Sequence, residues 1–139
     1  MSLFVLDASV TAAWCFADEA TDYTDRALDA LIAGQQAAVP PLWFYETANV
    51  LLGAMRTKRL TAAKVTSFLQ HLLTFAITVD SESPQRVFPE GLALAEAHGL
   101  TVYDAAYLEL ALRQGVPLLT VDRDLKKAAR AAGIPTAIA

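Results

Sequence analysis

Short apolar segments alternate with longer segments of helical periodicity along the chain, and this alternation restricts the possible folds most strongly. A glycine stands between a helix-like segment and the next apolar segment at four places, as expected where a helix C-cap leads into a strand: Gly34, Gly99, Gly115 and Gly133. Strands that alternate with helices and carry continuous apolar runs favour a parallel sheet covered by helices on both faces. The sequence therefore predicts an α/β protein, a three-layer α/β/α sandwich.

The same pattern predicts the individual elements. The expected strands are residues 3–6, 37–39, 77–79 and 117–121, with a weaker one at 136–138. The expected helices are residues 21–33, 42–58, 61–73, 84–98, 103–113 and 122–132. With 139 residues the chain can bury a core without disulfides or structural metal, and no linker or repeat is visible. We expect a single domain over residues 1–139.

Composition excludes several classes of protein. The net charge of −4 argues against a protein that coats nucleic acid through bulk electrostatics, because such domains are usually basic. No apolar stretch approaches the ~18 residues of a membrane span, and the N-terminus lacks the basic region of a signal peptide. The single Cys15 cannot form an intrachain disulfide and is expected in the core. These features predict a soluble, cytoplasmic protein.

Four acidic residues are expected at one edge of the predicted sheet. Asp7 and Asp122 directly follow strands, whereas Glu46 and Asp104 lie in the first turns of helices. The carboxyl ends of parallel strands share one edge, and ligands bind there. We therefore expect these four side chains to lie near one another.

The surroundings of these acids indicate a metal site. Asp7 is the only charged residue from position 1 to 17, Glu46 is the only one from 39 to 55, and Asp104 shares residues 99–112 with Glu109 alone. An unpaired buried carboxylate is costly, and two carboxylates about 4 Å apart repel by roughly 4 kcal/mol at an effective dielectric near 20. A hard cation such as Mg²⁺ relieves this repulsion, prefers oxygen ligands and can activate water for phosphodiester cleavage.

Each acid also has a structural interpretation. Asp104 stands three residues after Thr101 in a spacing like that of a capping box, and Asp122 could N-cap the last helix. Glu46 could complement a helix dipole. The joint arrangement of four acids at one edge favours the metal site.

A basic face lies beside the predicted site. Arg123, Lys126, Lys127 and Arg130 recur at helical spacing directly after Asp122, where they could guide a phosphate backbone, although a solvated charged face has the same pattern. If the face binds RNA, replacing Lys126 and Lys127 with Glu weakens binding and its salt dependence.

Other conspicuous residues have structural interpretations. Arg56, Lys58 and Arg59 are expected to cap a helix C-terminus. Core or interface packing, rather than base stacking, is expected of the aromatic residues Trp14, Phe16, Trp43, Phe44 and Tyr45. His71 and His98 lack ligand spacing to another His or Cys, so we assign them no metal role.

Four segments together carry a family resemblance: Phe4-Val-Leu-Asp7-Ala-Ser9, Tyr45-Glu46-Thr-Ala-Asn49, Tyr103-Asp104-Ala-Ala-Tyr107-Leu108 and Leu119-Thr120-Val-Asp122-Arg-Asp124-Leu125. In this order and spacing the chain resembles PIN-domain ribonucleases. Within that family it is most similar to the VapC-type toxins of toxin–antitoxin pairs, which are endoribonucleases. Each segment alone is weak, whereas the ordered set is specific.

The resemblance implies a parallel sheet of strand order 3-2-1-4-5 with Mg²⁺ or Mn²⁺ held by the acids. Asp7 and Asp104 match the principal metal ligands, and Glu46 and Asp122 match acids that complete the metal shell or orient the attacking water. The accessory positions that match are Ser9 and Thr120, whose hydroxyl groups hold the acids, and Asp124.

The resemblance also implies a homodimer and a cognate antitoxin that lies in a hydrophobic groove. Asp80 follows a strand as well, but that strand lies at the sheet edge in the family, so we leave Asp80 out of the site.

Competing functions fit less well. A phosphorylation receiver domain needs an acidic pair after the first strand, and an aspartyl-phosphate phosphatase needs an Asp where Ser9 stands. A non-catalytic scaffold that binds RNA or protein remains the alternative. The sequence carries no readable code for which RNA is cut.

Overall fold

The parallel sheet forms the centre of the protein in a computed structural model that describes residues 3–138; the outermost residues of the expected domain, 1, 2 and 139, lie outside that range. Within it the sheet has the strand order β3-β2-β1-β4, and every pairing is parallel. The strands are β1 (Leu3–Leu6), β2 (Gln36–Val39), β3 (Ile77–Val79) and β4 (Leu118–Leu119).

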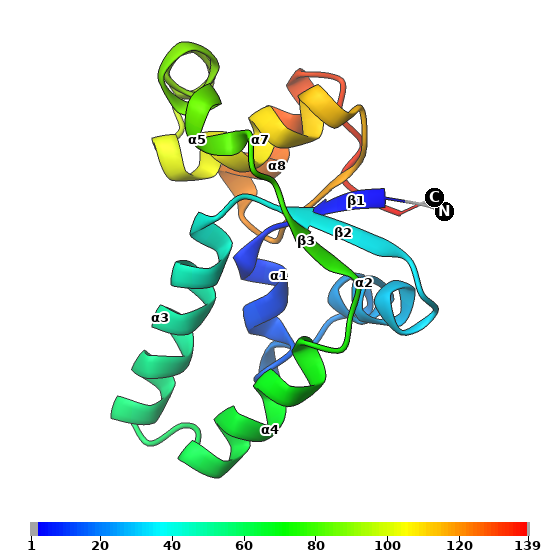
Figure 1. The fold of residues 1–139 in the computed structure, drawn as a ribbon, viewed down its shortest axis with the longest axis vertical. Helices are drawn as coiled ribbons and strands as arrows, with labels where there is room; N and C mark the ends of the chain where they lie inside the picture. Colours follow the sequence, from blue (N-terminus) through cyan, green and yellow to red (C-terminus); the bar gives the residue numbers. More distant parts are fainter. Residues whose placement is uncertain (1–2, 139) are drawn as a thin grey trace.

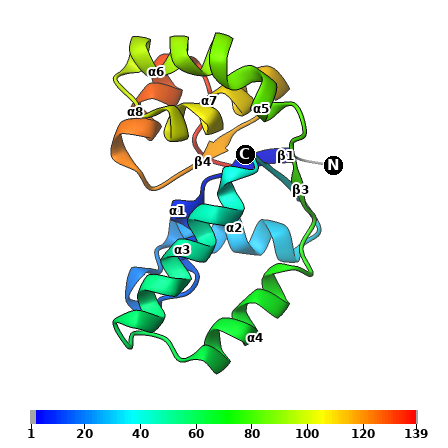
Figure 2. The same ribbon diagram turned by 60° about the vertical axis from the view of Figure 1, so that its left-hand side comes forward.

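Helices cover both faces of the sheet (Figures 1 and 2). One layer holds α1 (Ala8–Ala13), α2 (Asp22–Ile32), α3 (Leu42–Arg56) and α4 (Ala62–Leu72). The other holds α5 (Ser83–Arg86), α6 (Leu92–His98), α7 (Val102–Gln114) and α8 (Arg123–Ala131). The expected α/β fold class is therefore confirmed. No helix in the described range is both long and apolar enough to span a membrane.

The pairing of β1 with β4 positions the candidate site. Val5 is in register with Leu118 and Leu6 with Leu119, and the Asp7 N–H donates to the Leu119 carbonyl at 3.0 Å. The chain leaves β1 for β2 on one side and returns to pair as β4 on the other, so this edge is a topological switch point, where ligands bind in such sheets.

The C-terminal segment lies beside β4, where a fifth strand was expected. The Leu118 N–H donates to the Pro135 carbonyl at 2.9 Å, but residues 136–138 do not form a regular strand. Pro135 itself has no N–H to donate to a ladder.

The core lies on both faces of β1. Phe4, Val5 and Leu6 are at most 1% exposed, as expected for a central parallel strand. Residues 105–111 of α7 are all buried, because this helix packs against the sheet while α5, α6 and α8 surround it (Figure 2).

Two helical segments differ from the expected pattern. Helix α1 was not expected; Val10 and Thr11 are both fully buried, so its apolar run lacks the polar face that identifies a surface helix. The single helix expected over 84–98 is divided by a π-helical turn, Val87–Gly91. Pro89 lies inside this turn. In a regular α-helix it would lack the N–H that bonds to the carbonyl one turn earlier, and its ring would clash with that carbonyl. The wider π-helical turn avoids the missing hydrogen bond and the clash.

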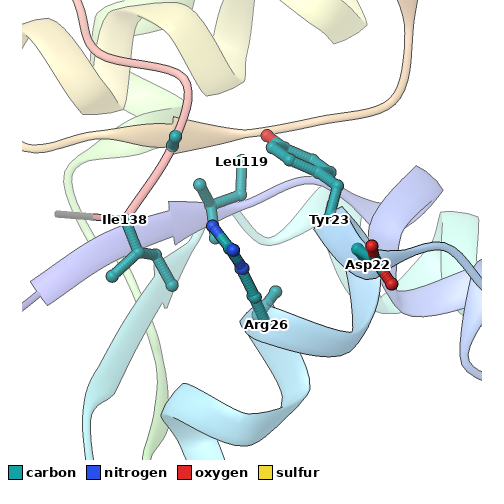
Figure 3. A pocket seen from close by; sticks show the side chains of 7 residues that line it. Asp22, Tyr23, Arg26, Leu119 and Ile138 are labelled. Carbon is teal, nitrogen blue, oxygen red and sulfur yellow. The ribbon is translucent and has the colours of Figure 1, made fainter.

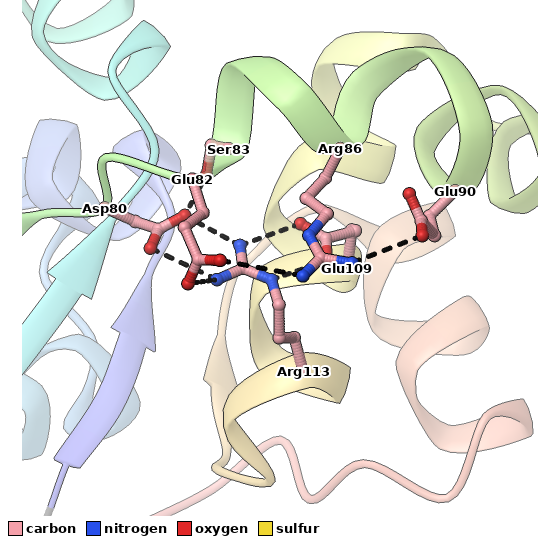
Figure 4. A network of polar contacts seen from close by, with 7 residues as sticks. All are labelled: Asp80, Glu82, Ser83, Arg86, Glu90, Glu109 and Arg113. Atoms are coloured by element: carbon pink, nitrogen blue, oxygen red, sulfur yellow. Dashed lines mark hydrogen bonds and ion pairs between the residues drawn. The ribbon is translucent and has the colours of Figure 1, made fainter.

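An ion-pair network fixes the end of β3 to the helices above it (Figure 4). The Arg113 guanidinium of α7 donates to Asp80 Oδ2 at 2.7 Å and to Glu109 Oε2 at 2.9 Å. Ser83 of α5 also donates to Asp80, at 2.6 Å. Asp80 thus has partners of its own, away from the acids expected in the site.

Candidate active site

Asp7 lies directly after β1 and is 5% exposed. The hydroxyl groups of Ser9 and Thr120 both donate to Asp7 Oδ2, at 2.6 and 2.7 Å, so neither occupies Oδ1. Burial raises the pKa of Asp7 above its ordinary value, although these two hydrogen bonds lower it. The negative charge of Asp122 raises it further, which indicates that the two acids interact across the β1–β4 boundary.

The same two hydroxyl groups join β1 to the chain after β4. Thr120 Oγ1 accepts from the Asp122 N–H at 3.0 Å, and Ser9 Oγ accepts from the Val121 N–H at 3.1 Å. The expected accessory positions therefore lie at the acidic edge. Asp122 Oδ2 accepts from the Leu125 N–H at 2.8 Å, so Asp122 also N-caps α8, as its structural interpretation predicted.

Asp104 lies in the first turn of α7 with its carboxylate half-buried. Thr101 Oγ1 accepts from the Asp104 backbone N–H at 3.1 Å, so this cap involves the backbone of Asp104 rather than its carboxylate. Burial, followed by the charges of Asp122, Asp7 and Asp124, raises the pKa of Asp104 to about 6. Asp104 therefore stands in a region of concentrated negative charge.

Glu46, in α3, is held by a residue that the sequence reasoning missed. Tyr107 of α7 is fully buried, and its hydroxyl donates to Glu46 Oε1 at 2.6 Å. Burial raises the pKa of Glu46, the Tyr107 hydrogen bond lowers it, and the charges of Asp7 and Asp104 raise it. The sequence feature that could have identified Tyr107 is its hydroxyl group in an apolar helical segment, three positions after Asp104.

The acids of this edge have no ion-pair partner among the residues that the structure describes. No salt bridge found between residues 3 and 138 involves Asp7, Glu46, Asp104 or Asp122. Asp80, in contrast, is paired with Arg113, and its pKa is lowered because the bonds from Arg113 and Ser83 outweigh the effect of burial. The four acids thus differ from a structural acid at the end of a neighbouring strand.

The acids do not form a closed coordination sphere. Within the described residues, no three His, Cys, Asp or Glu side chains are grouped closely enough to hold an ion by themselves. Their donor set, carboxylate oxygens alone, suits Mg²⁺, which retains several waters and needs only one or two carboxylates. The residues present therefore fit a hydrated hard cation better than one enclosed by protein ligands.

The basic face of α8 is partly engaged. The Lys126 ammonium lies 4.2 Å from the centre of the Tyr23 ring, a cation–π contact, whereas Arg123, Lys127 and Arg130 are exposed. Asp124 is exposed as well, and its charge contributes to the raised pKa of Asp104.

Two structural interpretations, those of Arg59 and Cys15, need correction, and that of Tyr45 is narrowed. Arg59 does not cap α3: it pairs with Asp18 and Glu19 and lies 3.8 Å from the centre of the Phe16 ring. Tyr45 is 78% exposed, so of the two expected roles, core or interface packing, it fits only the second, while Trp43 of the same helix is buried. Cys15 is half-buried rather than in the core, and burial raises its pKa to about 12.

Comparison with known families and proteins agrees with this architecture. The sequence profile of the PIN domain matches residues 4–131. The chain is 36% identical to ribonuclease VapC3 of Pyrobaculum aerophilum over 121 residues, which are 87% of this chain and 90% of that protein.

Solved structures share the fold. The crystal structure of PAE2754 from Pyrobaculum aerophilum superimposes with a TM-score of 0.69 at 24% identity, covering 99% of this chain and 88% of that one. The Mycobacterium tuberculosis toxin VapC20, described as cleaving the sarcin-ricin loop, gives 0.61 at 18% identity, covering 96% of each chain. A chain of VapBC2 from Rickettsia felis, bound to a promoter DNA fragment, gives 0.61 at 16% identity, covering 90% of this chain and 92% of that one. The chain therefore belongs to the PIN-domain family and is a relative of the VapC proteins.

Proposed function

We propose that this protein is a Mg²⁺- or Mn²⁺-dependent endoribonuclease that acts as the toxin of a toxin–antitoxin pair. One observation supports the proposal: Asp7 and Asp122 follow the adjacent strands β1 and β4, and neither they nor Glu46 and Asp104 have a basic partner among the described residues. The relation to ribonuclease VapC3 supports RNA as the substrate.

The four acids have two different roles in this proposal. Asp7 and Asp104 bind the cation, and Glu46 and Asp122 complete its shell or orient the attacking water. The hydroxyl groups of Ser9 and Thr120 hold Asp7 Oδ2, which turns the other oxygen to the ion. The bound cation supplies activation of water and stabilisation of the charge that develops on the phosphate.

The exposed cations of α8 extend the proposed site toward the phosphate backbone. Arg123, Lys127 and Arg130 attract RNA there, and Asp124 has an accessory role at the start of the same helix. Positive charges beside an acidic site compensate its repulsion of the polyanionic substrate.

The proposed partners are a second copy of the chain and an antitoxin. Two apolar clefts along α4 could accept an amphipathic segment. One, of about 450 Å³, includes Trp43, Leu51 and Leu69; the other, of about 410 Å³, includes Trp14 and Phe68. Surfaces of this kind on a single chain commonly mark protein contacts.

Titration calorimetry with Mn²⁺ tests the metal site. We expect the wild type to bind Mn²⁺ and an Asp7→Asn/Asp104→Asn variant to lose binding, because one or two carboxylates contribute most of the protein's ligands. Asp80→Asn is the matched control: it also removes an acid that follows a strand, yet it should leave Mn²⁺ affinity unchanged. Cleavage of an RNA oligonucleotide should follow the same order and stop when a chelator is added.

A non-catalytic scaffold is the alternative, and the lack of a closed group of metal ligands within the described range favours it. Equal Mn²⁺ binding by wild type and double variant, or no binding by either, would support the scaffold.

A further inference from the structure

The hydroxyl of Tyr23 joins three separate parts of the chain. Tyr23 lies in the first turn of α2 and is half-buried. Its oxygen accepts from the backbone N–H of Thr120 at 3.1 Å and donates to the backbone carbonyl of Thr136 at 2.5 Å. A single phenol therefore connects α2, the chain after β4 and the C-terminal segment.

Thr120 transmits this connection to the acidic edge. Its side chain is fully buried, donates to Asp7 and accepts from the backbone of Asp122. Tyr23 therefore binds the backbone of Thr120, and the side chain of Thr120 in turn binds Asp7 and Asp122, two of the proposed site acids. The Tyr23 hydroxyl thus stands one residue away from the site, although it bonds to none of its carboxylates.

A pocket of about 270 Å³ opens beside Tyr23, between α2 and the C-terminal segment (Figure 3). Arg26, Leu119 and Ile138 line it. Because this space is not filled by side chains, packing alone does not fix how closely α2 approaches the chain after β4. The two hydrogen bonds of the Tyr23 hydroxyl are specific ties across this boundary, and Lys126 covers the ring.

We propose that Tyr23 is a positioning residue of the acidic site, which sets the relative placement of Asp7 and Asp122 by fixing the backbone of Thr120. The inference rests on the proposed metal-dependent function. It also makes the C-terminal segment part of the support of the site, because Thr136 accepts the proton that orients the phenol. Removal of a group that orients a metal ligand without itself binding the metal commonly lowers metal affinity 10- to 100-fold.

Tyr23→Phe removes this hydroxyl and keeps the ring, so the packing and the contact with Lys126 remain. Thr24→Val is the matched control. Thr24 is the next residue in α2, is buried, and its hydroxyl exchanges hydrogen bonds with the Thr21 backbone at the start of the helix. The control therefore weakens the same helix without touching Thr120.

Calorimetric titration of Mn²⁺ into the wild type and the two variants, each with all 139 residues, tests the proposal, with thermal unfolding recorded for each. We expect about a tenfold or greater loss of affinity in Tyr23→Phe and unchanged affinity in Thr24→Val. The kcat for an RNA oligonucleotide should fall in Tyr23→Phe with little change in KM, because RNA contacts remain. Unchanged affinity in Tyr23→Phe, or equal losses in both variants, overturns the proposal and leaves Tyr23 a structural tie.

Hydrogen exchange of the wild type gives a second measurement that does not depend on a folded variant. If the Tyr23–Thr120 bond and metal binding stabilise each other, saturating Mg²⁺ slows exchange of the Thr120 amide more than that of the Asp80 amide, which is bonded to Val39 on the other side of the sheet. Equal effects at both amides contradict the proposal. Failure of the wild type to bind either ion overturns the proposed function together with this inference, whereas failure of Tyr23→Phe to differ overturns the inference alone.

Discussion

At Asp7 the fold buries a carboxylate and directs two hydroxyl groups to one of its oxygens. Sequence alone could identify this residue because an acid isolated in an apolar run requires an explanation. Sequence could not identify Tyr23, since its partner Thr120 is 97 residues away and the phenol lies in an ordinary amphipathic helix. A charged residue isolated in an apolar run can be recognised in the sequence, whereas a hydrogen bond between distant segments can be recognised only in the folded structure.

Tyr107→Phe should lower the affinity of the protein for Mn²⁺ by about tenfold. The variant leaves Glu46 without its buried hydroxyl donor, so the carboxylate is free to rotate away from the site. Tyr103→Phe, in the same helix at a position that is 66% exposed, is the control and should bind Mn²⁺ like the wild type. Calorimetry measures the Mn²⁺ affinity of both variants, and equal affinities would show that Tyr107 does not support the metal site.

Protonation of Asp80 should lower the stability of the protein in acid. Its pKa in the folded protein lies below the ordinary value because bonds from Arg113 and Ser83 outweigh burial. The carboxylate therefore contributes stability above about pH 4, near its unfolded pKa, and this contribution is lost as pH falls through the folded pKa. Urea unfolding between about pH 2 and pH 5 should show that the free energy of unfolding depends less on pH in Asp80→Asn than in the wild type, and parallel curves for both proteins would contradict the assignment.

At the scale of elements, alternation of apolar and helical segments was sufficient to predict the strands that form the sheet and most helices around it. It failed where burial removes the polar face, as in α1, and where Pro89 widens a helical turn. The expected fifth strand lies beside β4 without regular pairing: the Leu118 N–H bonds to the Pro135 carbonyl, and the Thr136 carbonyl accepts from the Tyr23 hydroxyl instead of from β4. Periodicity thus identifies amphipathic elements and misses those whose shape depends on tertiary contacts.

Arg113 joins β3, α5 and α7, and its loss should destabilise the fold. Arg113→Met removes the cation between Asp80 and Glu109, whose side chains are 10% and 7% exposed, and should cost about 3 kcal/mol because two buried charges lose their partner. Arg86→Met is the control: its partners Glu82 and Glu90 are about half exposed, so the cost should stay below about 1 kcal/mol. Urea unfolding measures both, and equal losses would show that burial of the network is unimportant.

At the scale of the whole molecule, a ligand that binds only the folded chain stabilises all of it. At a concentration one hundred times its Kd, Mg²⁺ should add about 2.7 kcal/mol to the free energy of unfolding, which raises Tm by roughly 10 °C in a protein of this size. Thermal unfolding followed by circular dichroism measures the shift. The Asp7→Asn/Asp104→Asn variant should show no such increase, and an equal increase would mean that the ion binds elsewhere.

The bond between Thr120 and Asp7 spans 113 residues of sequence, and this separation has a consequence during synthesis on the ribosome. A growing chain can form β1, the helices that follow it and β2 early, but Asp104, β4 and Asp122 are synthesised much later. Contacts this distant in sequence form late and slowly. The acidic edge is therefore incomplete in every nascent chain that ends before residue 122, so the proposed site cannot act until that residue has been synthesised.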